Sequence, residues 1–228
     1  MQATFFELLI KAISETHLIP YRQDNDNSNL VCHARYLWNT LLSESLYPPL
    51  QGLEVSLRNS IHNAITKTSG SEDWFSKILA PQEQKVLEEV KDRLRHQKKS
   101  LDIGQLVASS SFGFWVSLFD RRYEGTLWPR LLKDIFPHMP NHIRTRKTLL
   151  YRLNSIRHLR NRIFHYEPIW YRENLVQDHD YVLEAIGWIN PAMLETIKML
   201  DRFPEVYRQG NQSCEKILSD CMSRLGYI

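Results

Sequence analysis

A short segment near residue 160 carries side chains that could act on a phosphodiester. Residues 160–168 read RNRIFHYEP, and they place Arg160, Asn161 and His165 at the end of an expected long helix, just before Pro168. Arginine supplies a permanent cation for a phosphate, and histidine titrates near neutral pH. These are the two groups that cleavage of RNA without a metal ion requires. The segment therefore indicates RNA chemistry.

The helix expected to carry this segment runs from about Ile143 to His165. At about 100° per residue, its apolar side chains form one stripe about 120° wide, and Arg160 lies in the middle of that stripe. A charged side chain there is costly unless it is paired. The members of the stripe are Leu149, Leu153, Ile156, Leu159 and Ile163.

The opposite side of the same helix is polar, with Asn154, His158, Asn161 and His165 at spacings of four, three and four. Such a ridge is ordinarily a solvated face, but it holds no lysine or glutamate, so a contact between helices or a symmetric dimer contact is the other interpretation. Asn161 lies only about 40° from His165 on this face and could orient the imidazole through a hydrogen bond.

Arg160 and His165 are about 140° apart on an ideal helix, so they do not point at one phosphate without help. The reach of arginine, unwinding of the last turn before Pro168, or pairing of two copies about a twofold axis would bring them together. A plainer explanation is that the histidine only caps the negative end of the helix dipole.

A second polar set lies on an expected helix from Leu50 to Thr68, where Glu54, Arg58 and His62 recur every four residues. One interpretation is a pair between Glu54 and Arg58 within the helix, worth about 0.2–0.5 kcal/mol. The other places Glu54 against a buried arginine such as Arg160 and so fixes that guanidinium.

The composition predicts one all-α domain spanning residues 1–228. The chain is 43% hydrophobic and has only eight glycines, with apolar residues repeating every three or four positions. Nine or ten helices are expected. One of them ends at Pro48-Pro49, another covers about Leu127 to Phe136, and the last covers about Cys214 to Leu225. The net charge of +3 is uninformative by itself, so any affinity for polyanions must come from where the charges lie rather than from their sum.

Two further segments allow two interpretations each. The charged helix expected over 82–99 is either solvated or turns a basic end toward RNA, at Arg93, Arg95, Lys98 and Lys99. The aromatic residues of 111–124 are expected in the core, and stacking of exposed rings on bases is the alternative.

The sequence favours a cytoplasmic protein. Three cysteines, Cys32, Cys214 and Cys221, are too few for a disulfide framework and lack the spacing of a zinc site. The first residues predict an amphipathic helix rather than a signal peptide, and no run reaches the ~20 apolar residues that span a bilayer.

These residues resemble a known family. RNRIFHYEP is similar to the signature of the HEPN superfamily, an arginine followed four to six residues later by a histidine. Three ordered blocks, RYLWNTLLSESLYPPLQGLEVSLRNSIHNAI, SFGFWVSLF and LNSIRHLRNRIFHYEPIW, resemble the motifs of the Abi-like abortive-infection proteins of bacteria, the AbiD/AbiF group. The resemblance covers about Arg35 to Pro191.

The resemblance implies an all-α HEPN-type helical bundle with additional N- and C-terminal helices. It further implies a homodimer with a composite cleft and a metal-independent ribonuclease, without cofactors, that acts in phage defence or as a toxin. Arg160, Asn161 and His165 match the catalytic motif. Glu54 and Arg58 match a recurring block that is either catalytic or architectural.

In such a mechanism Arg157 or Arg162 would contact flanking phosphates. By the same resemblance, an antitoxin protein, another partner protein or a small noncoding RNA could control the site. Two other functions stay open. One is a non-catalytic HEPN module that binds RNA or a partner protein, and the other is a helix end modified by a nucleotidyl-transferring partner at Tyr166.

Overall fold

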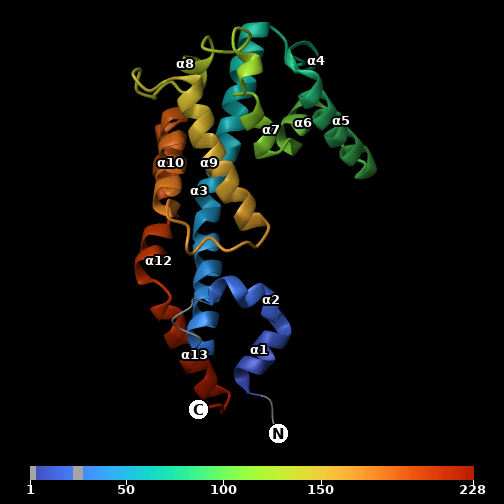
Figure 1. Cartoon of the computed structure of the whole chain (residues 1–228). Coiled ribbons are helices and arrows are strands. Elements are labelled where there is room, and N and C mark those ends of the chain that lie inside the picture. Colours follow the sequence, from blue (N-terminus) through green and yellow to red (C-terminus); the bar gives the residue numbers. More distant parts are fainter. Residues whose placement is uncertain (1–3, 23–27) are drawn as a thin grey trace. The chain divides into compact units, whose positions relative to one another are not determined.

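The computed structural model of the protein describes residues 4–22 and 28–228. This part of the chain is all-α, as the composition predicts, and contains no β-strand (Figure 1). The α-helices are α1 (Phe5–Ile13), α2 (Glu15–Leu18), α3 (Asn29–Ser69), α4 (Phe75–Ile78), α5 (Pro81–His96), α6 (Ile103–Ser109), α7 (Phe112–Ser117), α8 (Leu132–Ile135), α9 (Arg146–Phe164), α10 (Leu175–Ile189), α11 (Pro191–Lys198), α12 (Phe203–Gln209) and α13 (Gln212–Arg224), with 3-10 helices η1 (Ile19–Tyr21) and η2 (Arg121–Tyr123).

The chain folds into two compact units, each built from separate stretches of sequence. The first unit comprises 1–47, 161–175 and 201–228, and the second comprises 48–160 and 176–200. Helices α3 and α9 each contribute residues to both units. That the chain forms a single domain stays a prediction.

The first unit is held together by α1, α13 and the first part of α3. Phe5, Ala34, Cys214 and Leu218 form its main buried cluster, and a ring of partly buried apolar side chains packs around them. Asn39 of α3 fixes the segment that follows the RNRIFHYEP motif, because its Oδ1 accepts hydrogen bonds from the backbone N–H groups of Ile169 and Trp170 at 2.6 and 3.1 Å.

The second unit has a core rich in aromatic rings. Phe114 and Trp115 of α7 are buried, as expected for the aromatic segment 111–124, so these rings are not free to stack on bases. Trp74 packs against Trp115 with ring centroids 6.3 Å apart. Leu57 of α3 and Leu153 of α9 are fully buried in the same unit.

Pro48 and Pro49 do not end a helix, contrary to the prediction, because α3 continues through both of them to Ser69. An internal proline removes a backbone hydrogen bond and crowds the carbonyl four residues earlier, which costs about 3 kcal/mol. Leu46, Leu50 and Leu53 are buried on the two sides of the prolines. Burial at about 1.5–3 kcal/mol for each side chain offsets the loss.

Two other expectations about helices are wrong. The stretch Leu127 to Phe136 is helical only over Leu132–Ile135, since a proline at 129 disfavours helical geometry for the residue before it. Thirteen α-helices lie in the described residues, more than the nine or ten expected, because four-residue helices such as α2 and α4 leave no periodicity in the sequence.

Candidate functional site

Helix α9 carries the predicted motif and begins at Arg146 rather than at Ile143, because Thr145 caps it by accepting a hydrogen bond from the N–H of Thr148 at 3.1 Å. Its predicted apolar stripe is confirmed, since all five members are buried. The helix is regular to Phe164, so the unwinding proposed for its last turn is not observed. The boundary between the two units falls between Arg160 and Asn161, and the two parts of the motif are therefore described within their own units.

In the second unit, Arg160 is paired with a carboxylate. Its Nη2 lies 3.6 Å from Oε2 of Glu54 on α3, and the two side chains are 27% and 24% exposed. The structure thus places Glu54 beside Arg160, as in the second interpretation of the polar set on α3, and that Glu54 fixes this guanidinium for catalysis stays a prediction. A guanidinium in an apolar stripe gains most from such a partner, because an unpaired charge there would be poorly solvated.

Arg58, one turn after Glu54, makes a different contact. Its Nη1 donates a hydrogen bond to the backbone carbonyl of Ala108 at 3.0 Å. Arg157, one turn before Arg160, passes close to the α7 backbone at Gly113. A Cβ atom added to Gly113 would lie 3.8 Å from Cδ of Arg157. Both arginines are half-buried.

In the first unit, the end of α9 forms a Schellman motif around His165. The N–H of Tyr166 donates to the carbonyl of Ile163 at 3.1 Å, and the N–H of Glu167 donates to that of Arg162 at 2.8 Å. Tyr166 therefore occupies the left-handed position, with φ of 58°, where glycine is usual. The motif sets the direction in which the chain leaves the helix just after His165.

Arg162 holds the segment after His165 against the helix end. Its Nη2 donates to the carbonyl of Pro168 at 2.6 Å and to the hydroxyl of Tyr171 at 3.2 Å, and its Nε lies 3.6 Å from a carboxylate oxygen of Glu167. Two hydrogen bonds of its Nη2 and one ion pair are thus made within the protein. Its contact with a flanking phosphate stays a prediction.

The polar face of α9 is open to solvent at three of its four positions. His158, Asn161 and His165 are exposed, and Asn154 is half-buried. The bond that joins Asn161 to His165 is the backbone one, from the N–H of His165 to the carbonyl of Asn161 at 2.9 Å. Orientation of the imidazole by the Asn161 side chain therefore stays a prediction.

Exposed aromatic rings surround the motif in the first unit, and the sequence analysis missed them as a group. Tyr166 is 80% exposed, and Phe164 and Tyr171 are exposed as well. The ring of Phe164 lies 6.2 Å from that of Tyr47, which is also exposed. The sequence signal that could have indicated them is the group of aromatic residues directly beside His165. Exposed rings of this kind suit base stacking or contact with a protein.

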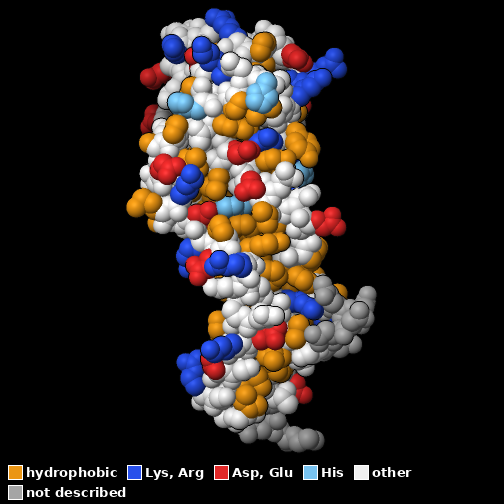
Figure 2. Space-filling view, turned by 90° about the vertical axis from the view of Figure 1, so that its left-hand side faces the viewer, with side chains coloured by type: hydrophobic (Ala, Val, Ile, Leu, Met, Phe, Trp, Pro, Cys, Tyr) orange, Lys and Arg blue, Asp and Glu red, His pale blue; other side chains and the backbone are white. Residues whose placement is uncertain are grey.

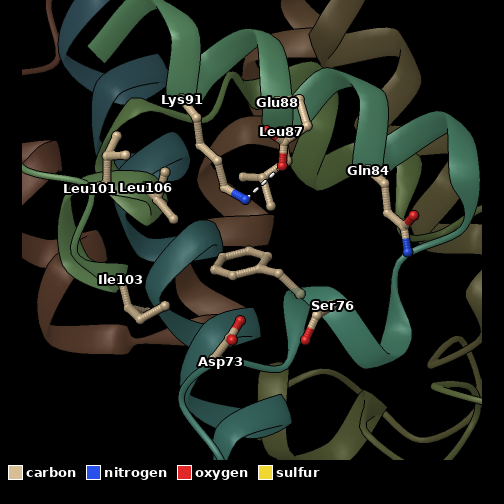
Figure 3. Close-up of a pocket in the computed structure, with 10 residues that line it drawn as sticks. Asp73, Ser76, Gln84, Leu87, Glu88, Lys91, Leu101, Ile103 and Leu106 are labelled. Atoms are coloured by element: carbon tan, nitrogen blue, oxygen red, sulfur yellow. Dashed lines mark hydrogen bonds and ion pairs between the residues drawn. The ribbon is translucent and has the colours of Figure 1, made fainter. Parts of the chain in front are cut away.

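A pocket of about 460 Å³ lies in the second unit (Figure 3). Lys91 and Glu88 form an ion pair at 2.7 Å on its wall. Leu101, Ile103 and Leu106 line another side of it. Because Asp73 also lines the pocket and the Lys91–Glu88 pair is internally neutral, the lining has a net negative charge and does not suit a phosphate chain.

The charged side chains of the surface are mixed in sign. On the face that Figure 2 shows, Lys and Arg side chains lie among Asp and Glu side chains, in keeping with the net charge of +3. Any local excess of positive charge must therefore come from particular clusters.

Within the described residues, no three His, Cys, Asp or Glu side chains are grouped so that they could hold a metal ion, and no helix there is both long and apolar enough to cross a membrane. All three cysteines are free thiols, and burial raises the pKa of Cys32 and Cys214.

Comparison with known proteins finds no match among family models, curated proteins or solved structures.

Proposed function

We propose that the chain is a metal-independent endoribonuclease of the Abi-like group in the HEPN superfamily, acting in bacterial phage defence or as a toxin. The observation that carries the proposal is the ion pair between Glu54 and Arg160. A guanidinium that is half-buried and held by a carboxylate is preorganised to receive a phosphate. Exposed His165, at the end of the same helix, supplies the group that moves protons near neutral pH.

In this mechanism the 2′-hydroxyl of the RNA attacks the adjacent phosphorus. His165 accepts the hydroxyl proton, and Arg160 stabilises the charge on the pentacoordinate phosphate. The bond to the 5′ oxygen then breaks, leaving a 2′,3′-cyclic phosphate, and the departing 5′ oxygen takes up a proton from solvent to give a 5′-hydroxyl. General acid–base catalysis of this kind contributes about 10²–10⁴ in rate. Asn161 would orient His165, and the remaining predicted arginines would contact flanking phosphates. DNA, which lacks the nucleophile, would not be cleaved.

The proposal includes a cytoplasmic homodimer whose two motifs face each other, regulated by an antitoxin or a small noncoding RNA. Pairing of two copies would bring an arginine of one chain to the histidine of the other. The alternative is a non-catalytic HEPN module that binds RNA or a partner protein. The exposed rings of Tyr47, Phe164 and Tyr166 favour a binding surface and are compatible with either function.

The test is cleavage of total bacterial RNA in EDTA, with RNA ends identified by sequencing that is sensitive to cyclic phosphates. We expect cyclic-phosphate ends from the wild type and none from His165→Ala. His158→Ala is the matched control, because His158 is an exposed histidine on the same helix, and it should retain activity. Cleavage that disappears in EDTA, or that persists in His165→Ala, would contradict the mechanism.

A further inference from the structure

The backbone that joins α6 to α7 is surrounded by arginines from three different helices. Arg58 of α3 donates to the carbonyl of Ala108 at 3.0 Å, and Arg93 of α5 donates to the carbonyl of Ser109 at 2.7 Å. Arg157 of α9 lies against Gly113. All of these residues belong to the second unit. Two guanidinium groups thus bind the backbone at residues 108–109, and the side chain of Arg157 passes the backbone at Gly113.

The positive charge of this cluster is not neutralised within the described part of the chain. Arg58, Arg93 and Arg157 form no ion pair there, and the contacts of the first two are with uncharged carbonyl oxygens. Other arginines of the unit differ, because Arg160 is paired with Glu54 and Arg95 with Asp92. The three guanidinium groups therefore carry their charge without a carboxylate at ion-pair distance in this part of the structure.

The cluster is also incompletely satisfied in its hydrogen bonds. The Nε atoms of Arg58 and Arg157 are buried and have no hydrogen-bond partner in the described structure. Buried polar groups without a partner are uncommon and usually have a functional or structural reason. A nearby anion would stabilise the uncompensated guanidinium charges, because charge–charge attraction is strong where water is partly excluded. Arg93 is exposed and is therefore the member that a ligand reaches directly.

We propose that Arg58, Arg93 and Arg157 form a binding site for the phosphates of single-stranded RNA at the α6–α7 corner. This deepens the proposed function and rests on RNA being the ligand. Arginine suits the task because its planar fork of donors can bond a carbonyl and a phosphate oxygen at the same time. Arg93 lies on α5, a helix that the proposed catalytic mechanism does not otherwise involve. The new role in this proposal is that of Arg93 in substrate binding.

The test is equilibrium binding of a fluorescent 2′-O-methyl RNA of mixed sequence at several salt concentrations. The modification blocks the attacking hydroxyl, so the wild-type protein can be used. Each phosphate contact on a single strand contributes about 0.7 to the slope of log affinity against log salt. Arg93→Gln should lower the magnitude of that slope by about 0.7. Between about 50 and 200 mM salt, the affinity of the variant should therefore fall by a factor about three times smaller than that of the wild type.

Arg95→Gln is the matched control. Arg95 lies on the same helix, is exposed, and is already paired with Asp92 at 2.6 Å, so its removal should leave the slope unchanged. Arg93→Lys should keep the slope, since the charge remains. Circular dichroism of each variant checks that the fold survives loss of the contact with Ser109.

The outcomes separate this site from the proposed function. An unchanged slope in Arg93→Gln, or an equal change in Arg95→Gln, overturns the site, and cleavage of ordinary RNA by the wild type would still support the nuclease. A slope that depends on Arg93 without any cleavage supports the site and contradicts the nuclease. A wild-type protein that neither binds nor cleaves RNA overturns both.

Discussion

Replacing Tyr166 by glycine should stabilise the protein. Tyr166 has φ of 58° in the Schellman motif that ends α9, and left-handed geometry costs a residue with a Cβ about 1–2 kcal/mol. Glycine removes this cost but loses about 0.5–1 kcal/mol of backbone entropy on folding. The side chain is 80% exposed, so little burial is lost. The net expectation is a gain of about 0.5–1 kcal/mol.

The chain contains matched controls for this prediction. α5 ends in the same hydrogen-bond pattern with Lys98 in the left-handed position, and α13 ends in it with Gly226. Lys98→Gly should therefore stabilise by a similar amount, and Gly226→Ala should destabilise by about 1 kcal/mol. Tyr166→Ala removes the ring but keeps the strained geometry, so it should change little.

The assay is thermal and urea unfolding of the four variants beside the wild type. For a chain of this size, the melting temperature shifts by about 2–4 °C for each kcal/mol, so Tyr166→Gly should raise it by about 1–4 °C. The reasoning is refuted if Tyr166→Gly destabilises while Lys98→Gly stabilises, because the tyrosine ring would then contribute more than its exposure allows. A gain in stability together with weaker RNA binding would indicate that the strain is retained for function.

Two further predictions concern the second unit. Glu54→Gln should lower the free energy of unfolding by about 1 kcal/mol, since it removes the carboxylate that lies 3.6 Å from the half-buried Arg160. The exposed pair of Glu44 with Arg202 makes Glu44→Gln the control, with an expected effect below about 0.5 kcal/mol. Equal effects of the two variants in urea unfolding would contradict this prediction. Burial lowers the pKa of His62, whose Nδ1 accepts a hydrogen bond from Trp74 at 3.0 Å. Near and below the ordinary histidine pKa of 6.5, the unfolded state therefore binds more protons than the folded state, so the free energy of unfolding should decrease as the pH falls through that value. His62→Gln should flatten this part of the plot of unfolding free energy against pH. An unchanged plot in this variant would contradict the role of His62.

The predictive power of the sequence was greatest where the signal is local. The stripe on α9 follows from spacing alone, and because Arg160 lies in that stripe, the need for a partner also follows. Burial of Phe114 and Trp115 follows from the size of their rings. The prediction that a helix ends at Pro48-Pro49 was wrong because the effect of a proline is local to its own helical turn. The continuity of α3 depends instead on the buried leucines on either side of the two prolines.

By itself, the sequence determined the helical class, the motif at the end of α9 and the face of that helix that is buried, since all three depend on residues a few positions apart. The tertiary structure alone decided which carboxylate meets Arg160, how Arg93 reaches Ser109 and which rings beside His165 remain exposed. These contacts join residues distant in the chain, and long-range packing selects among partners that local spacing leaves equivalent.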